Sequence, residues 1–355
     1  MSYLDRSEII KKYDPGKMLE SLDAFPDQIN QAWTESRKFK VPVNYKAINS
    51  VVIAGMGGSA WPWKIIQALY DQVIKIPFRV ISDYRVPGNV DSKTLFIGSS
   101  YSGSTEEPVQ AVRTAKKIGA KVAIIASGKN MVSLARAWKV PAYLFQARYN
   151  PSGQPRLGTG YMMFGALGML SRFGVVSLTN QQVNKVVRIA RTGGKKWSLN
   201  IPLKKNKTKQ LALRLVNSIP MIISAEHLLG TSEAFRNRLN ENSKHWSIAY
   251  PIPDLNHHLL EGLGNPAAAK RLMAVYLESK LYDKRNQKRF QVTQSVMKKY
   301  KIPAYSFRPN GSNKLEEVII SLSFSGYVSF WLAMLHKINP TPIPWVDYFK
   351  YQLKK

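Results

Sequence analysis

Residues 50–60 read SVVIAGMGGSA, and this stretch decides the fold class. A short apolar run leads into glycines at positions 55, 57 and 58, and a helical pattern begins directly after them. Glycines at a strand-to-helix turn let backbone N–H groups approach an anion at the positive N-terminus of the helix. The stretch therefore predicts an α/β unit with a candidate anion site at its turn.

Further apolar runs follow at the spacing of a parallel sheet. Nearly continuous hydrophobic runs indicate strands that helices cover on both faces, and segments of helical pattern separate them. The other expected strands are residues 78–81, 94–97 and 121–125 in the first half and residues 220–223, 246–250, 272–276 and 304–307 in the second half. This alternation predicts two similar α/β domains in tandem.

The composition suggests where the chain divides. A change in composition follows residues 173–174, and residues 185–209 are basic and rich in turn formers. We expect an N-terminal helical segment over residues 1–45 with a helix near residues 16–36, a first domain over residues 46–175, and a second domain over residues 176–355 that ends in a C-terminal helix.

The overall composition excludes several classes of protein. The chain has 355 residues, of which 45% are hydrophobic and 11% aromatic, so a disordered, collagen-like or disulfide-scaffold protein is excluded. Cysteine is absent, which removes disulfides, thiolate metal sites and a cysteine nucleophile. We expect a reducing, cytoplasmic location, and the charges throughout the first thirty residues predict no signal peptide.

The charge balance is strongly basic. The chain has 52 Lys and Arg against 22 Asp and Glu, a formal net charge of +30. No acidic residue lies between Glu107 and Glu226, whereas 20 Lys or Arg do. Such a field attracts phosphate groups on a metabolite, a nucleic acid or a lipid surface, although a host with generally basic proteins would give the same balance.

One stretch raises the question of a membrane span. Residues 318–335 are 18 uncharged residues, about the minimum length for a spanning helix. Ser321, Ser325 and Ser329 recur on one helical face, and a face of small residues lets a helix pack closely on a sheet. We therefore expect a buried core helix and no membrane association.

The first glycine turn leaves three interpretations open. Its pattern Gly-x-Gly-x-x-Ala over residues 55–60 matches a permissive dinucleotide fingerprint, and Asp83 at the end of the next strand could bind a ribose hydroxyl. Alternatively, Gly58 and Ser59 hold a single phosphate. The turn could also be structural only, with Ser59 as the N-cap of the following helix.

A second loop favours the phosphate interpretation. Residues 98–107, GSSYSGSTEE, carry five Ser or Thr hydroxyls at the start of another expected helix. Ser104 and Glu107 could form a capping box, but a cap needs only one hydroxyl, so the cluster predicts a phosphate site. The candidate phosphate-binding residues are Gly58, Ser59, Ser100, Ser102 and Thr105.

Six motifs in order carry a family resemblance. They are residues 55–59 (GMGGS), 100–107 (SYSGSTEE), 154–156 (QPR), 238–244 (RLNENSK), 254–257 (DLNH) and 339–342 (NPTP) with Lys350. Together they resemble the sugar-isomerase (SIS) domain, in particular the bifunctional phosphoglucose/phosphomannose isomerases of archaea and some bacteria. The chain departs from them at Ser104, where many members carry Asn, at Asn339, where Asp is common, and at residues 258–261.

The resemblance implies two SIS domains, each a flavodoxin-like parallel sheet, in a homodimer without cofactor or metal. It also implies the reversible aldose–ketose isomerisation of hexose 6-phosphates. By resemblance Glu241 moves a proton between adjacent carbons and Arg156 stabilises the enediolate. His257, from the partner subunit, opens the sugar ring with help from Lys350.

The leading hypothesis is an isomerase that interconverts glucose 6-phosphate, mannose 6-phosphate and fructose 6-phosphate. A non-catalytic SIS sugar-phosphate sensor is the alternative, but the roughly 45 residues before the first strand are too few for a full helix-turn-helix domain. An NAD-dependent dehydrogenase is supported only by the glycine turn and Asp83. None of these hypotheses requires nucleic-acid binding despite the basic charge.

Overall fold

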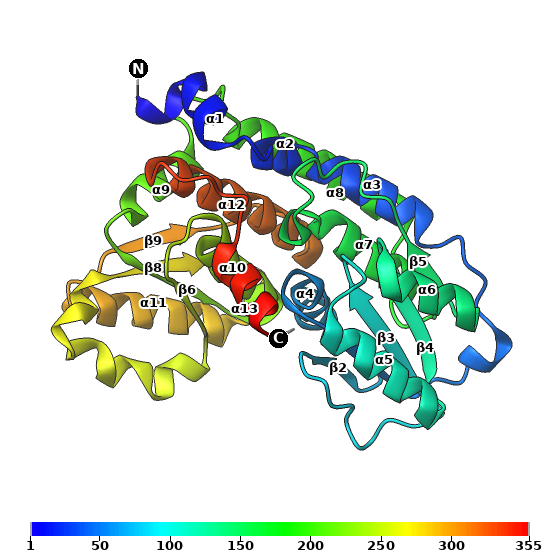
Figure 1. The fold of residues 1–355 in the computed structure, drawn as a ribbon. Coiled ribbons are helices and arrows are strands. Elements are labelled where there is room, and N and C mark those ends of the chain that lie inside the picture. The colour runs from blue at the N-terminus through cyan, green and yellow to red at the C-terminus, as the bar shows by residue number, and fades with distance from the viewer. Residues whose placement is uncertain (1, 354–355) are drawn as a thin grey trace.

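The computed structural model describes residues 2–353, which form two parallel sheets with helices around them (Figure 1). The first sheet has the strand order β2-β1-β3-β4-β5, the order of flavodoxin-like sheets. Its strands are β1 (Ser50–Gly55), β2 (Phe78–Ile81), β3 (Thr94–Ser100), β4 (Lys121–Ala126) and β5 (Ala142–Leu144). The four strands expected here are confirmed, and β5 is a short strand that the sequence analysis did not predict.

The second sheet repeats this arrangement without a fifth strand. Its order is β7-β6-β8-β9, and every pairing is parallel. Its strands are β6 (Ile219–Ser224), β7 (Ile248–Pro251), β8 (Leu272–Leu277) and β9 (Ala304–Phe307), all four as expected. Because β9 pairs only with β8, it forms the edge of the sheet in the described part of the chain.

Strand β1 shows why the strands read as continuous apolar runs. Val51 and Ile53 point into the main core of the molecule, whereas Val52 and Ala54 point into a second core on the other face. Successive side chains of a strand point to opposite faces, so a strand covered on both faces must be apolar throughout. Helices α5 (Glu106–Ile118) and α6 (Lys129–Trp138) cover the second face.

The remaining helices join the two sheets into one body. The single helix expected near residues 16–36 is two helices, α2 and α3, which follow a short α1. These three and the other helices are α1 (Ser7–Tyr13), α2 (Met18–Asp23), α3 (Phe25–Glu35), α4 (Trp61–Tyr70), α7 (Thr159–Arg172), α8 (Asn180–Trp197), α9 (Lys207–Leu215), α10 (Leu229–Asn242), α11 (Lys284–Lys299), α12 (Lys314–Leu335) and α13 (Pro344–Gln352). Helix α3 packs on α7 and α8, and α4 of the first half packs on α10 of the second (Figure 1). The division at residue 176 stays a prediction.

Helix α12 is the apolar segment that raised the question of a membrane span. Within residues 2–353 it is the one helix long and apolar enough to cross a bilayer, and 89% of its most apolar window is buried in the protein. Its serines face α10 and not a sheet, because Ser325 accepts a hydrogen bond from Arg238 and Ser329 accepts one from Asn242. The helix is therefore packed as a core helix, and its small residues allow a close approach to α10.

The contact between α4 and α10 is equally close. A Cβ atom at Gly230 would lie 2.5 Å from the backbone nitrogen of Ile65 and 2.6 Å from its Cα. Backbone cannot move aside as a flexible side chain can, so we expect Gly230→Ala to separate the two helices and lower the stability by about 1–3 kcal/mol. Thermal unfolding measures this as a lower Tm.

Gly262→Ala is the matched control, because no atom lies within 4 Å of the Cβ it would add. Its Tm should equal that of the wild type. Equal Tm values for both variants would contradict the close approach of α4 and α10.

Candidate active site

The turn after β1 is tied to the loop after β3. Gly57 has a positive φ of +46°, and the turn over Gly57–Ser59 precedes α4. The Ser59 hydroxyl accepts a hydrogen bond from the backbone N–H of Tyr101 at 2.8 Å, and the Ser99 hydroxyl donates to the Ser59 carbonyl at 2.8 Å. Ser59 makes no cap on α4, so the interpretation as an N-cap is wrong.

The loop after β3 has an inner and an outer set of hydroxyls. Ser100 is buried, donates to the Thr105 hydroxyl at 3.1 Å and accepts from the Gly103 N–H at 3.1 Å. Ser102 and Ser104 are exposed, and Thr105 is half-buried. The buried hydroxyls of Ser59 and Ser99 hold the two loops together and that of Ser100 braces its own loop, whereas Ser102 and Thr105 are accessible to a ligand.

Two further features of this loop bear on its function. Gly103 has a φ of +71°, and a Cβ there would overlap the carbonyl oxygen of Gly128 at 1.5 Å, so the bend requires glycine. The capping box of Ser104 and Glu107 is absent, because α5 begins after Thr105 without a side-chain cap. The N–H groups of the first turn of α5 therefore have no side-chain partner, as an anion site requires.

Arg156 joins the two candidate phosphate loops, residues 55–60 and 98–107 (the phosphate loop pair), to the second half of the chain. The position where a Gly58 Cβ would lie is 3.1 Å from the backbone nitrogen of Arg156. The guanidinium, 3% exposed, donates to the side chains of Asn242 and Gln154 at 2.7 Å each. It also donates to the carbonyl oxygens of residues 340 and 341 at 2.9 and 2.7 Å. Four of its five N–H groups are used, which leaves one for a substrate.

Glu241 lies in the last turn of α10 beside this guanidinium. Its Oε2 is 3.9 Å from Arg156 Nε, and its side chain is 31% exposed. Burial raises the pKa of Glu241 above its usual value, although the surrounding cations Arg156, Lys244, Lys350 and Arg238 oppose that shift. A carboxylate with a raised pKa is suited to accept and return a proton.

Arg238 supports Glu241 from one turn earlier in α10. Its buried guanidinium donates to the carbonyl of Leu322, to Ser325 at 2.9 Å and to Thr159 at 3.0 Å. Burial lowers the pKa of Arg238 to about 10, with Glu241 acting in the opposite direction, so the residue stays cationic at neutral pH. Arg238 thus fixes α10 against α7 and α12.

Lys244 is a site residue to which the sequence analysis assigned no role. Its Nζ donates to the carbonyls of Glu241 at 2.8 Å and Pro340 at 2.9 Å. Burial, followed by repulsion from Arg156, lowers the pKa of Lys244 to about 8. Gln154, a partner of Arg156, was also not assigned a role, because spacing along the chain does not reveal contacts between distant segments.

Lys350 lies near Glu241, whereas His257 makes no contact with Glu241 within the described chain. Lys350 is on α13 and is close enough to act on the pKa of Glu241. His257 is exposed at the end of the short turn Asp254–His257, and within residues 2–353 its side chain has no hydrogen bond or ion pair. The structure therefore brings Glu241, Arg156 and Lys350 together in one chain and leaves His257 apart from them.

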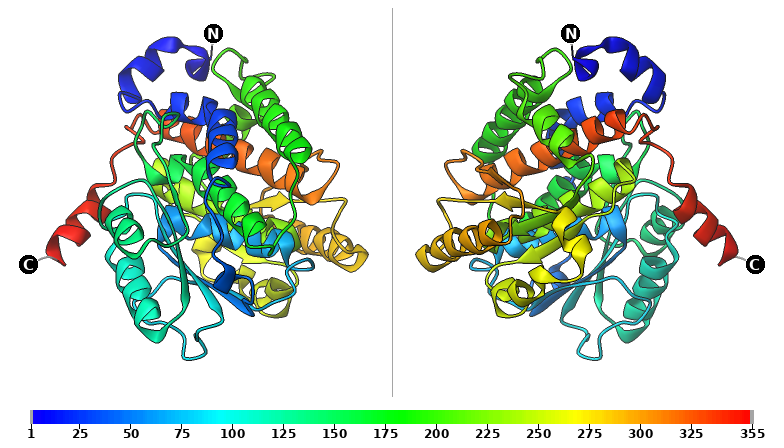
Figure 2. Two further views of the ribbon diagram at one scale, coloured as in Figure 1. Left: turned by 90° about the vertical axis from the view of Figure 1, so that its right-hand side faces the viewer. Right: turned by 90° about the vertical axis from the view of Figure 1, so that its left-hand side faces the viewer.

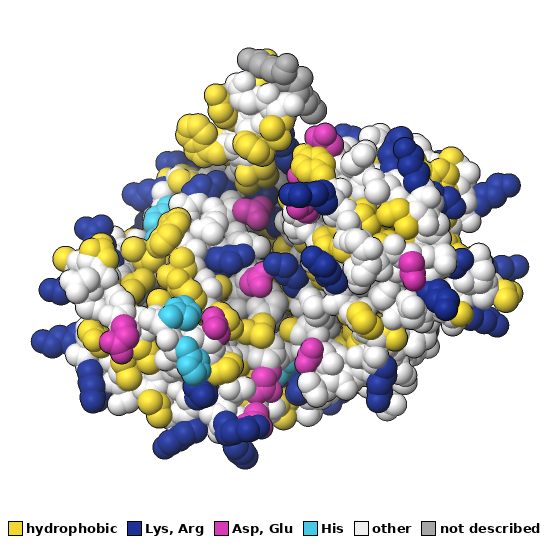
Figure 3. Space-filling model, turned by 90° about the horizontal axis from the view of Figure 1, so that it is seen from below, with side chains coloured by type: hydrophobic (Ala, Val, Ile, Leu, Met, Phe, Trp, Pro, Cys, Tyr) yellow, Lys and Arg dark blue, Asp and Glu magenta, His cyan; other side chains and the backbone are white. Residues whose placement is uncertain are grey.

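Helix α13 projects from the rest of the molecule (Figure 2). Trp345 is 81% exposed and Phe349 is 60% exposed, and no described residue of α13 is buried. Seen from below, hydrophobic side chains cover the projecting part, and Lys, Arg and acidic side chains gather at its base between the two halves (Figure 3). Exposed apolar surface of this kind is common at interaction sites of proteins.

The corresponding turn of the second sheet has Glu226 and His227 in place of glycines. After β6, Glu226 has a φ of +45°, close to that of Gly57 after β1. Its carboxylate accepts hydrogen bonds from the Asp283 N–H and from Asn286. The next residue, His227, is buried 2.8 Å from Glu317. Side chains thus occupy the place that glycines leave open in the first half.

Asp83 and His258 both make contacts with residues close to them in the chain. The Asp83 carboxylate accepts from the backbone N–H groups of Tyr84 and Arg85, so it stabilises its own turn. His258 pairs with Asp254 at 3.3 Å. No group of three His, Asp or Glu side chains within residues 2–353 could hold a metal ion.

Comparison with known proteins defines the class. Residues 204–353 match the family model for the bacterial phosphoglucose isomerase C-terminal SIS domain. A hypothetical protein from Thermus thermophilus superposes with a TM-score of 0.74 at 14% identity, covering 99% of this chain and 93% of the other. The fold is thus that of SIS-domain proteins.

The sequence relatives define the particular family. The chain is 31% identical over 345 residues to the bifunctional phosphoglucose/phosphomannose isomerase of Caldicellulosiruptor bescii, covering 95% of this chain and 98% of the relative. It is 26% identical to the Aquifex aeolicus protein of the same name over 331 residues, covering 91% and 94%. The chain belongs to the bifunctional phosphoglucose/phosphomannose isomerase family.

The lowered pKa of Lys244 can be measured directly. With a pKa of about 8, half of its side chains are neutral at pH 8, whereas an ordinary lysine is almost fully protonated there. Only the neutral amine reacts with an acylating reagent, so brief acetylation at pH 8 should label Lys244 at least about tenfold faster than an ordinary exposed lysine. Peptide mass spectrometry gives the rates.

Lys288, exposed on α11, is the internal control. Raising the pH to about 11 makes ordinary lysines largely neutral as well, so the advantage of Lys244 should then shrink. Equal labelling of Lys244 and Lys288 at pH 8 would contradict the lowered pKa.

Proposed function

We propose that this protein interconverts glucose 6-phosphate and mannose 6-phosphate with fructose 6-phosphate through an enediolate intermediate. The observation that carries the proposal is the contact of Glu241 with Arg156, next to the phosphate loop pair. A carboxylate with a raised pKa, a fixed cation and an anion site in one place supply what the proton transfer between C1 and C2 needs. The family named above is defined by the same reaction.

The residues take the following roles. The phosphate sits on the N–H groups of α5 and on Ser102 and Thr105, which fixes the unreactive end of the sugar. Glu241 removes the proton from C2 of the aldose and returns it to C1. The remaining N–H of Arg156 and its positive charge stabilise the enediolate oxygen.

Ring opening requires a group that one chain does not place at the site. We assign this step to His257 of the partner subunit, helped by Lys350, because His257 has no contact with Glu241 in its own chain. The exposed apolar face of α13, which includes Trp345 and Phe349, supports a homodimer in which a second copy covers this helix.

A coupled assay with glucose 6-phosphate and mannose 6-phosphate as separate substrates tests the function. Both should give fructose 6-phosphate, and a chelator should leave the rates unchanged. Binding of either sugar phosphate without turnover would instead indicate the sensor function.

Glu241→Gln tests the base. The substitution keeps the shape but cannot accept the proton, so kcat should fall by about 10²–10⁴-fold while KM changes little. In the wild type, kcat should decrease as the pH falls through the raised pKa of Glu241, because the protonated form is inactive. Initial rates across pH measure both effects.

The matched control is Glu233→Gln, which lies on the same helix and pairs with Lys64 at 2.8 Å away from the site. It should retain the rate of the wild type. A Glu241→Gln rate within about threefold of the wild type would contradict the assignment.

Mixed dimers test the origin of the histidine. When Glu241→Gln and His257→Ala subunits are co-expressed, each mixed dimer has one site with both substitutions and one with neither. With random pairing half of the dimers are mixed, so roughly a quarter of the sites should regain wild-type activity. Purification through two different tags isolates the mixed dimers, and roughly half of their sites should show wild-type activity.

Each variant alone should be nearly inactive and provides the baseline. Mixed dimers that form but remain inactive would show that His257 acts within its own chain.

A further inference from the structure

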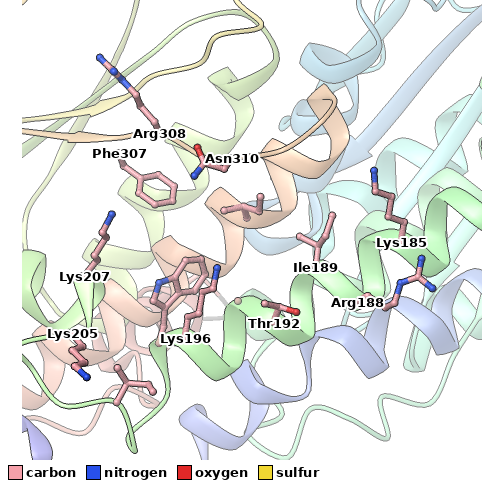
Figure 4. Close-up of a pocket in the computed structure, with 14 residues that line it drawn as sticks. Lys185, Arg188, Ile189, Thr192, Lys196, Lys205, Lys207, Phe307, Arg308 and Asn310 are labelled. Carbon is pink, nitrogen blue, oxygen red and sulfur yellow. The ribbon is translucent and has the colours of Figure 1, made fainter.

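A second basic cavity lies away from Glu241 and the phosphate loop pair. It has a volume of about 720 Å³ and opens between α8, the chain that follows α8, the end of β9 and α12 (Figure 4). In the first sheet a fifth strand follows the fourth, whereas the chain leaves β9 directly for α12. The cavity lies beside this open edge and shares no residue with the candidate active site.

The floor of the cavity is apolar and rigid. Ile189, Trp197 and Phe307 contribute to it, with Ile201 and Ile320. The ring of Phe307 stacks on Phe324 at 3.8 Å, and Trp197 packs edge-on to the same ring at 5.6 Å. These contacts fix the aromatic side chains in place, so the floor is formed before any ligand binds.

The wall is positively charged and contains no carboxylate. Its cations are Lys185, Arg188, Lys196, Lys205, Lys207 and Arg308. Lys185 pairs with Glu316 at 2.7 Å, and Arg308 pairs with Glu278. The other four cations have no acidic partner within residues 2–353, and they surround the apolar floor from α8 and the chain that follows it (Figure 4).

We propose that this cavity is a second ligand site, for an organic polyanion with an aromatic body, the chemistry of a nucleoside di- or triphosphate. Its volume is in the usual range of small-molecule sites, about 300–1,000 Å³. Unpaired cations favour several negative charges, and an apolar floor with aromatic side chains favours a flat ring system. A hexose phosphate has no such ring, so the site differs in specificity from the active site.

A peptide strand added to β9 fits the structure less well. Arg214 donates a hydrogen bond at 2.8 Å to the carbonyl of Ala304, on the side of β9 that faces away from β8. One of the acceptors that an added strand would need is therefore already occupied. The cavity, in contrast, is open.

The proposal is tested by calorimetric titration of the protein with four separate ligands. They are ATP, inorganic tripolyphosphate, adenosine and a glutamate-rich peptide. ATP should bind at least about tenfold more tightly than tripolyphosphate, because only ATP covers the apolar floor. Adenosine, which lacks the charges, should bind more weakly than ATP by a similar factor. Arg188→Gln with Lys196→Gln should weaken ATP binding by at least about tenfold.

The matched control is Lys288→Gln with Lys298→Gln, which removes two exposed cations from the middle and the last turn of α11. Its affinity for ATP should equal that of the wild type, and unchanged Tm values confirm that both double variants are folded. Equal affinities for ATP and tripolyphosphate would overturn the proposal. An equal loss of ATP affinity in both double variants would do the same, because either result indicates non-specific attraction to a cationic surface. Tighter binding of the peptide than of ATP would overturn the proposal and indicate a peptide-binding surface. Competition of ATP with fructose 6-phosphate in the assay would also overturn it, because ATP would then bind in the active site.

Discussion

The candidate active site depends on one buried guanidinium. Arg156 has only 3% of its surface exposed, and a buried charge is tolerated only when hydrogen-bond acceptors surround it. Its acceptors come from three separate parts of the chain, namely Gln154, Asn242 at the end of α10, and the carbonyls of residues 340 and 341 before α13. The need to satisfy this one cation therefore brings the first-half loop, the helix of Glu241 and the start of α13 to the same point.

Much of the fold could be predicted because its strands are covered on both faces. Strands such as β1 and β8 contain nearly continuous apolar runs, and this pattern identifies them without reference to the rest of the chain. Strand β5 was missed because it has three residues, of which only Tyr143 is buried. The stripe of serines on α12 correctly indicated close packing but not its partner, since Ser325 and Ser329 meet side chains more than eighty residues away.

Prediction of the candidate site is limited in the same way, because contacts between distant segments cannot be read from the sequence. The order of the motifs identified Glu241 and Arg156 as candidates, and the structure brings the two together. One interpretation of the sequence made Ser59 the N-cap of the next helix. Its hydroxyl instead accepts a hydrogen bond from the N–H of Tyr101, 42 residues away. No role was predicted for Lys244, because its hydrogen-bond partners are backbone carbonyls, which every residue type has. Motifs thus indicate which side chains take part, whereas long-range contacts determine what each one does.

The surroundings of Glu241 balance two opposing effects. Burial favours the protonated form of its carboxyl, which cannot act as a base, and the neighbouring cations oppose this shift. One of those cations, Lys350, lies on α13, a helix that has no buried residue in the described chain. In the proposed dimer the partner subunit covers the apolar face of α13 and so holds Lys350 in position. Assembly and the ionisation of the proposed catalytic carboxylate are then linked through a single helix, because whatever holds α13 in place also sets the distance between Lys350 and Glu241.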